Sequence, residues 1–209
     1  MRVAGLDGTK GGWAAIVLEE GLFAGDALLP LASDFAELGD VEAIGIDVPI
    51  GFGPDRAADK AARAFLRGAA STVFSTPARE LLERPYGPGL PLSAQAHALG
   101  GRIIHVTELA FADPRIREVH PEVSFRAMNG GRPLRGRKRS AAGGLERIEL
   151  LRREGIDLTE VEAVAAVPLD DVFDAAAVAW TATRVAKGEA QTLPEEPPVV
   201  DGRPMAIWY

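Results

Sequence analysis

The chain of 209 residues contains no cysteine. This absence excludes disulfide bonds, zinc sites built on thiolates, and cysteine nucleophiles. Histidine is also scarce, with three residues in the whole chain. A metal site in this protein is therefore expected to use oxygen ligands, and an oxygen-only ligand set favours Mg²⁺ or Mn²⁺ over zinc.

Long apolar runs are missing as well. Hydrophobic residues make up 47% of the chain, yet no stretch of about 18 consecutive apolar residues occurs, so no membrane-spanning helix is expected. The first apolar segment begins directly after Met1 and Arg2, which leaves no room for a secretion signal and indicates a cytoplasmic protein.

An excess of positive charge is absent too. The net charge of −7 argues against a surface built for non-specific binding of nucleic acid, although a local basic patch is compatible with it. Carboxylates clustered to bind a metal ion would contribute to this negative net charge.

The order of apolar segments and turns predicts an α/β fold in a single domain over residues 1–209. A glycine-rich turn after Asp7 favours an antiparallel hairpin. In the helix predicted at 140–154, Leu145, Ile148 and Leu151 are expected to face inward. Residues 71–115 are a possible helical insertion. The expected strands lie at about 2–7, 12–18, 22–29, 42–48 and 116–120, and the main helices at about 56–67, 78–84, from 93 onward, 122–128, 140–154 and 169–187.

The most informative residue is Asp7, which ends the first apolar strand. A charged carboxylate at the end of a buried strand is costly unless a partner neutralises it. A divalent metal is such a partner. Asp7 could instead bind the amides of its own glycine turn, but the buried character of the strand before it favours a functional role.

Further acids stand where other strands end or helices begin. Asp47 ends the strand at 42–48, and Glu122 lies in the first turn of a short helix. Asp171 and Asp174 are three residues apart, so they share one face of the last helix. Each also has a simpler interpretation, as a turn residue or as an acid at a helix N-terminus.

Carboxylates at one edge of a parallel sheet meet in space, and open α/β sheets bind ligands at that edge. Such a cluster repels itself unless cations join it. We therefore expect one or two Mg²⁺ or Mn²⁺ ions at this edge. The predicted ligands are Asp7, Asp47, Glu122, Asp171 and Asp174, of which all but Asp171 are also predicted to be catalytic.

Positive side chains follow in a loop at residues 132–139, which contains no acid. A solvated loop is the simpler interpretation, but beside a metal site such a loop would suit a polyanion. Thr9 and His120 are expected close behind the metal ligands, where His120 could assist proton transfer, although a lone histidine is more often structural. The predicted contacts to a substrate phosphate are Lys10, Arg135, Arg137, Lys138 and Arg139.

Several motifs together resemble a family of predicted nucleases with an RNase H-like fold, catalogued as domain of unknown function 429. The resemblance covers nearly the whole chain, and the block from His120 to Leu134 is its most specific part. The motifs are Gly5-Leu-Asp-Gly-Thr-Lys-Gly-Gly-Trp13, Ile46-Asp-Val-Pro-Ile-Gly51, Val73-Phe74, Glu118-Val-His-Pro-Glu-Val-Ser-Phe125, Asn129-Gly-Gly-Arg-Pro-Leu134 and Asp170-Asp-Val-Phe-Asp-Ala175.

The resemblance implies an RNase H-like core, the fold shared with Holliday-junction resolvases and integrases: a mixed sheet with antiparallel and parallel strands, flanked by helices. In that superfamily the first strand carries an acid, which matches Asp7. A second acid lies on a later strand or nearby helix, which Asp47 or Glu122 could supply. The last helix of resolvases carries acids three apart, which matches Asp171 and Asp174.

Three functions stay open from the sequence. The leading hypothesis is a Mg²⁺- or Mn²⁺-dependent nuclease that hydrolyses phosphodiester bonds of nucleic acid. The second is a phosphotransferase of the actin-like fold that binds ATP, because Asp7-Gly8-Thr9 resembles the phosphate-contacting hairpin of those enzymes. The third is a non-catalytic module that binds a metal or nucleic acid.

Overall fold

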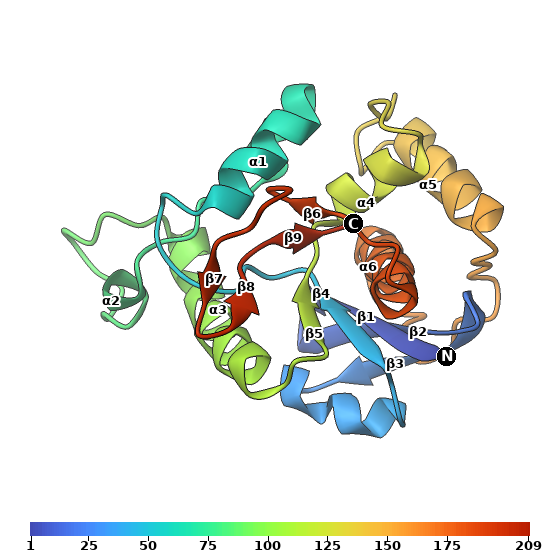
Figure 1. Ribbon diagram of the computed structural model, residues 1–209, viewed down its shortest axis with the longest axis horizontal. Helices are drawn as coiled ribbons and strands as arrows, with labels where there is room; N and C mark the ends of the chain where they lie inside the picture. Colours follow the sequence, from blue (N-terminus) through green and yellow to red (C-terminus); the bar gives the residue numbers. More distant parts are fainter.

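The computed structural model describes residues 1–209 and is built around a five-stranded mixed sheet of strand order β3-β2-β1-β4-β5 (Figure 1). The first three strands pair antiparallel, and β4 and β5 then continue the sheet parallel to β1. This RNase H-like arrangement confirms the predicted fold class. The strands are β1 (Arg2–Thr9), β2 (Gly12–Glu19), β3 (Leu22–Leu29), β4 (Ala43–Ile46) and β5 (Ile116–Glu118).

Helices cover both faces of the sheet. One face carries the long helix α6 (Leu169–Lys187), with α4 (Pro121–Met128) and α5 (Ala141–Arg153) beside it. The other face packs against α3 (Ala94–Ala112) and the 3₁₀ helix η1 (Ala32–Leu38). Side chains alternate between the two faces along each strand, so two separate hydrophobic clusters form, one on each side of the sheet.

The remaining elements lie between β4 and β5 and after α6. Residues 71–115 contain α2 and the 19-residue helix α3. That these residues form an insertion stays a prediction. No helix combines the length and the apolar character needed to cross a membrane. The elements not yet given are α1 (Ala57–Leu66), η2 (Arg67–Thr72), α2 (Arg79–Leu82), β6 (Thr192–Leu193), β7 (Val199–Val200), β8 (Arg203–Pro204) and β9 (Ile207–Trp208).

The helix predicted at 140–154 forms as α5, but its inward face differs from the expected one. Leu145 is 67% exposed, whereas Arg147 is 1% exposed. Leu151 is buried, as predicted. The prediction for Leu145 was wrong because apolar spacing alone cannot show that a half-buried carboxylate, Glu122, binds an arginine on this helix.

Two glycines let α6 lie directly on the sheet. A Cβ atom added to Gly5 on β1 would stand 2.7 Å from the Cα of Ala179 and nearer still to other backbone atoms of α6. A Cβ atom added to Gly45 on β4 would stand 2.6 Å from the Cγ1 of Val178. Helix α6 therefore approaches β1 and β4 as closely as backbone atoms allow. This close contact determines where the side chains in the first turns of α6 lie relative to the two strands.

Candidate metal centre

Two carboxylates project side by side from the central strands. Along β1, Val3, Gly5 and Asp7 share the face beneath α6, because side chains alternate between faces. Asp47 comes directly after β4, and its backbone N–H donates a hydrogen bond to the carbonyl of Leu6, 2.9 Å away. The parallel register of β1 and β4 continues to this point, so Asp7 and Asp47 leave neighbouring strands on the same face.

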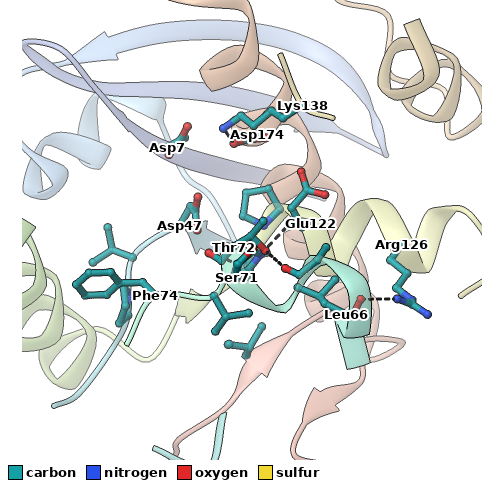
Figure 2. A pocket seen from close by; sticks show the side chains of 18 of the residues that line it. Asp7, Asp47, Leu66, Ser71, Thr72, Phe74, Glu122, Arg126, Lys138 and Asp174 are labelled. Atoms are coloured by element: carbon teal, nitrogen blue, oxygen red, sulfur yellow. Dashed lines mark hydrogen bonds and ion pairs between the residues drawn. The ribbon is translucent and has the colours of Figure 1, made fainter. Parts of the chain in front are cut away.

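The third carboxylate comes from α6. Asp174 precedes Ala175, whose carbonyl faces Gly5, so the close approach of helix and strand brings Asp174 over the ends of β1 and β4. One oxygen each of Asp7, Asp47 and Asp174 lies within 4.8 Å of the other two (Figure 2). Asp7 and Asp174 are buried, and Asp47 is half-buried. Three of the predicted ligands are thus brought together by the structure.

Burial and mutual repulsion make these three carboxylates resist ionisation. Burial raises the pKa of Asp7 well above its ordinary value, and the charges of Asp47 and Asp174 raise it further. Burial and the charge of Asp174 act in the same direction on the pKa of Asp47. Burial also raises the pKa of Asp174 to about 7, although the nearby Lys138 ammonium opposes the shift.

The residues present fit a hard divalent cation. All three side chains offer carboxylate oxygens, the ligands that Mg²⁺ and Mn²⁺ prefer. The Oδ1 atom of Asp174 is buried and has no hydrogen-bond partner, and a buried acceptor without a partner is costly. A cation bound among the three oxygens would satisfy this atom and remove the repulsion. The cluster is therefore compatible with a metal site.

A pH-dependent stability difference follows from the raised pKa of Asp47. Because its pKa is higher in the folded protein than in the unfolded chain, the folded state binds more protons above pH 4, and stability falls as the pH rises through the folded pKa. We expect metal-free Asp47→Asn to melt above wild type at pH 8, and the difference to shrink towards pH 4. Thermal melts of both proteins in chelator across this range measure it, and an equal or lower melting temperature at pH 8 would contradict it.

Glu122 lies outside the group of three. Its carboxylate forms an ion pair with Arg147, whose side chain is 2% exposed. It still contributes to the field of the site, since its negative charge raises the pKa of Asp47 and of Asp174. Asp171 is half-buried one turn earlier on α6, and its charge raises the pKa of Asp7.

His120 caps helix α4. Its Nδ1 accepts a hydrogen bond from the backbone N–H of Glu122, 3.2 Å away, and its Nε2 lies 3.3 Å from the carbonyl of Thr72. An acceptor at Nδ1 and a carbonyl at Nε2 require the neutral ring with its proton on Nε2. Burial lowers the pKa of His120, which agrees with a neutral ring. This geometry shows a structural use of His120 at the cleft wall.

The basic loop is held against acids at the start of α6. The Nζ of Lys138 contacts Oδ2 of Asp174 and lies 3.8 Å from Asp170. The Nε of Arg139 donates to Asp170 over 2.8 Å. Arg135 and Arg137 are exposed at the rim of the site, and Lys10 is exposed at the β1–β2 turn. Two of the five predicted phosphate contacts are therefore already paired with carboxylates.

Sequence reasoning missed several arginines that shape the site. Arg102 of α3 donates to the carbonyl of Thr9 over 2.6 Å and so fixes the turn after Asp7. Arg56 forms an ion pair with Glu118, which also accepts the backbone N–H of Ile50 over 2.7 Å. This pair anchors the segment that follows Asp47. Arginine on or next to a helix ordinarily indicates a solvent-facing position, so only the partners that these two side chains meet, a backbone carbonyl and a buried acid, reveal their role.

A cleft of about 880 Å³ opens beside the carboxylates. Its polar part includes Asp7, Asp47 and Asp174, and its apolar part includes Val48, Phe74 and Ile103. Figure 2 shows Phe74 beyond Asp47, on the side away from Lys138. The three carboxylates and the aromatic side chain of Phe74 therefore line the same cavity.

Comparison with known proteins gives one family match. Residues 5–199 match the model of a family described as "Protein of unknown function (DUF429)". No curated protein matches the chain.

Proposed function

We propose that this chain, which belongs to the DUF429 family of proteins of unknown function, is a Mg²⁺- or Mn²⁺-dependent nuclease. The observation that carries the proposal is the group of Asp7, Asp47 and Asp174 at the carboxyl ends of the central parallel strands of an RNase H-like sheet. Ligands of α/β sheets bind at that edge, and a buried oxygen of Asp174 lacks a partner there.

Asp7, Asp47 and Asp174 would hold the metal. A divalent ion at such a site polarises a phosphodiester and stabilises the charge that develops on the leaving oxygen. Asp171 and Glu122 stand behind this group and contribute negative charge. Arg147 forms an ion pair with Glu122 at the wall of the cleft, so the negative charge of Glu122 is compensated.

The shape of the cleft is better suited to enclosing one nucleotide of a single strand than to binding a duplex, which needs a flatter surface. Its volume of about 880 Å³ reaches from the carboxylates to Phe74, and aromatic rings stack on bases of any identity. Of the cations in the basic loop, Lys138 and Arg139 already neutralise acids of this chain, so Arg135 and Arg137 are the loop side chains proposed to meet substrate phosphates. We therefore propose single-stranded nucleic acid as the preferred substrate.

A nuclease assay tests the proposal. Labelled single strands, duplexes, RNA–DNA hybrids and junctions are incubated with Mg²⁺, with Mn²⁺ and with chelator. We expect metal-dependent cleavage, fastest for single strands, and none in chelator. Absence of cleavage for every substrate would contradict the proposal.

Two companion measurements separate the alternative functions. Saturable ATP binding in calorimetry without cleavage would favour an actin-like phosphotransferase. A ligand that binds the native state raises the melting temperature. A melting temperature unchanged by Mn²⁺, together with no cleavage, would favour a module whose acids are structural.

A further inference from the structure

One positively charged side chain, Lys138, already contacts the cluster of Asp7, Asp47 and Asp174. Lys138 ends at the Asp174 carboxylate, beside Asp7 and above Asp47 as drawn in Figure 2. It contacts Oδ2 of Asp174 and leaves the other oxygen, Oδ1, buried and without a partner. The two oxygens of this side chain thus have different surroundings: one is neutralised by the ammonium, and the other is available to a cation.

The loop that carries Lys138 is anchored on α5. Ser140 caps the helix by accepting the backbone N–H of Gly143 over 3.1 Å, and its hydroxyl donates to the carbonyl of Arg137 over 2.8 Å. A Cβ atom added to Gly143 would stand 2.7 Å from the carbonyl carbon of Arg137. Glu146 accepts the backbone N–H of Arg135 over 2.8 Å. Lys138 is therefore held in place by backbone contacts on both sides.

Two of the other acids nearby are compensated by partners of their own, whereas Asp171, half-buried and without an ion-pair partner, lies outside the group of three. Glu122 is paired with Arg147, and Asp170 is paired with Arg139. Once Asp7, Asp47 and Asp174 are all ionised, as metal binding requires, they carry three negative charges, of which Lys138 balances one. A single divalent ion balances the remaining two. Buried charges are stable only when they are compensated, so a second divalent ion would leave an excess of positive charge.

We infer that Lys138 takes the place of a second metal ion, so that the carboxylates bind one divalent cation and the ammonium supplies the remaining positive charge. The inference rests on the proposed metal site, and it adds the number of ions and the residue that sets this number. In this arrangement Lys138 is a positioning and charge-balancing residue for Asp174.

Calorimetric titration with Mn²⁺ of wild type, Lys138→Met, Lys138→Arg and Arg132→Met tests the inference. Wild type is expected to bind one ion per chain. Lys138→Met is expected to take a second ion or to bind the first at least tenfold more tightly, because the ammonium no longer competes for Asp174. Lys138→Arg keeps the charge and is expected to bind one ion with wild-type affinity.

Arg132→Met is the matched control, since it removes one positive charge from the same loop at an exposed position that does not line the cleft. It is expected to leave both the stoichiometry and the affinity unchanged. The inference is overturned if wild type binds two ions or none, if Lys138→Met behaves as wild type, or if Arg132→Met changes binding as much as Lys138→Met does.

Thermal melts in chelator keep the test valid for variants that fold poorly. Lys138→Met leaves three uncompensated carboxylates, so the metal-free variant is expected to melt below wild type and to recover more stability when Mn²⁺ is added. An equal Mn²⁺-induced rise in both proteins would count against the inference. If the protein binds one ion but cleaves no substrate, the nuclease proposal alone is contradicted. If the protein cleaves a substrate and binds two ions, this inference alone is contradicted.

Discussion

Asp7→Asn is expected to abolish metal-dependent cleavage and to weaken Mn²⁺ binding strongly. Changing an outer partner of a metal ligand already costs roughly 10- to 100-fold in affinity or activity, so losing a ligand is expected to cost at least about 100-fold. The substitution hardly alters the volume of a side chain that is 7% exposed. It removes one of three charges that repel each other, so the metal-free variant is expected to be at least as stable as wild type at pH 8.

Three measurements on Asp7→Asn separate a lost site from a lost fold. Mn²⁺ titration gives the affinity, cleavage of a single strand gives the activity, and a melt in chelator reports the stability. Asp55→Asn is the matched control, because Asp55 is an exposed carboxylate that pairs only with Lys60. Wild-type Mn²⁺ binding by Asp7→Asn would remove Asp7 from the site, and wild-type cleavage would remove it from the mechanism.

Gly5→Ala is expected to destabilise the fold by about 3 kcal/mol or more, at the upper end of what overpacking costs in a core. The added methyl group would meet the backbone of Ala175 and Ala179 on α6. Backbone atoms of a helix cannot rotate away as the end of a side chain can, so α6 must move off the sheet. Asp174 moves with it, and Mn²⁺ affinity is expected to fall in the fraction of protein that still folds.

Urea denaturation of Gly5→Ala and of Gly87→Ala measures this effect. An added Cβ atom at Gly87 has no atom within 4 Å, so that control is expected to stay within about 0.5 kcal/mol of wild type. A Gly5→Ala protein with wild-type stability and wild-type Mn²⁺ affinity would show that the contact between β1 and α6 is not needed to place Asp174.

Much of the fold could be predicted because its elements have strong local patterns. The predicted last helix at 169–187 coincides with α6, and the apolar segments at 2–7, 12–18 and 22–29 lie within β1, β2 and β3. Turn glycines and apolar periodicity act within a few residues, so they can be read from neighbouring letters. The helix predicted at 56–67 shows the limit, since α1 ends at Leu66 and the next residue, Arg67, has a φ of 48°, a conformation that local patterns indicate at glycine.

The candidate site could be predicted only in part. Asp7, Asp47 and Asp174 stood out because each carboxylate follows or opens an apolar element. Glu122 had the same local pattern, yet it pairs with Arg147 from a helix whose sequence indicated another inward face. Lys138 was expected to face a substrate phosphate, whereas it contacts Asp174. Long side chains choose partners that are distant in sequence, and local patterns carry no information about those partners.

By itself the sequence determined the kind of chemistry that is open to this protein. It has no thiolate and few histidines, so a metal site must use carboxylates, and its strand and helix patterns place those carboxylates at the ends of elements. Only the tertiary structure decided which acids meet. Gly5 and Gly45 bring α6 onto β1 and β4, and that contact puts Asp174 beside Asp7 and Asp47. The physical reason is that repulsion and charge balance depend on distances of a few ångströms between residues that lie far apart in the chain.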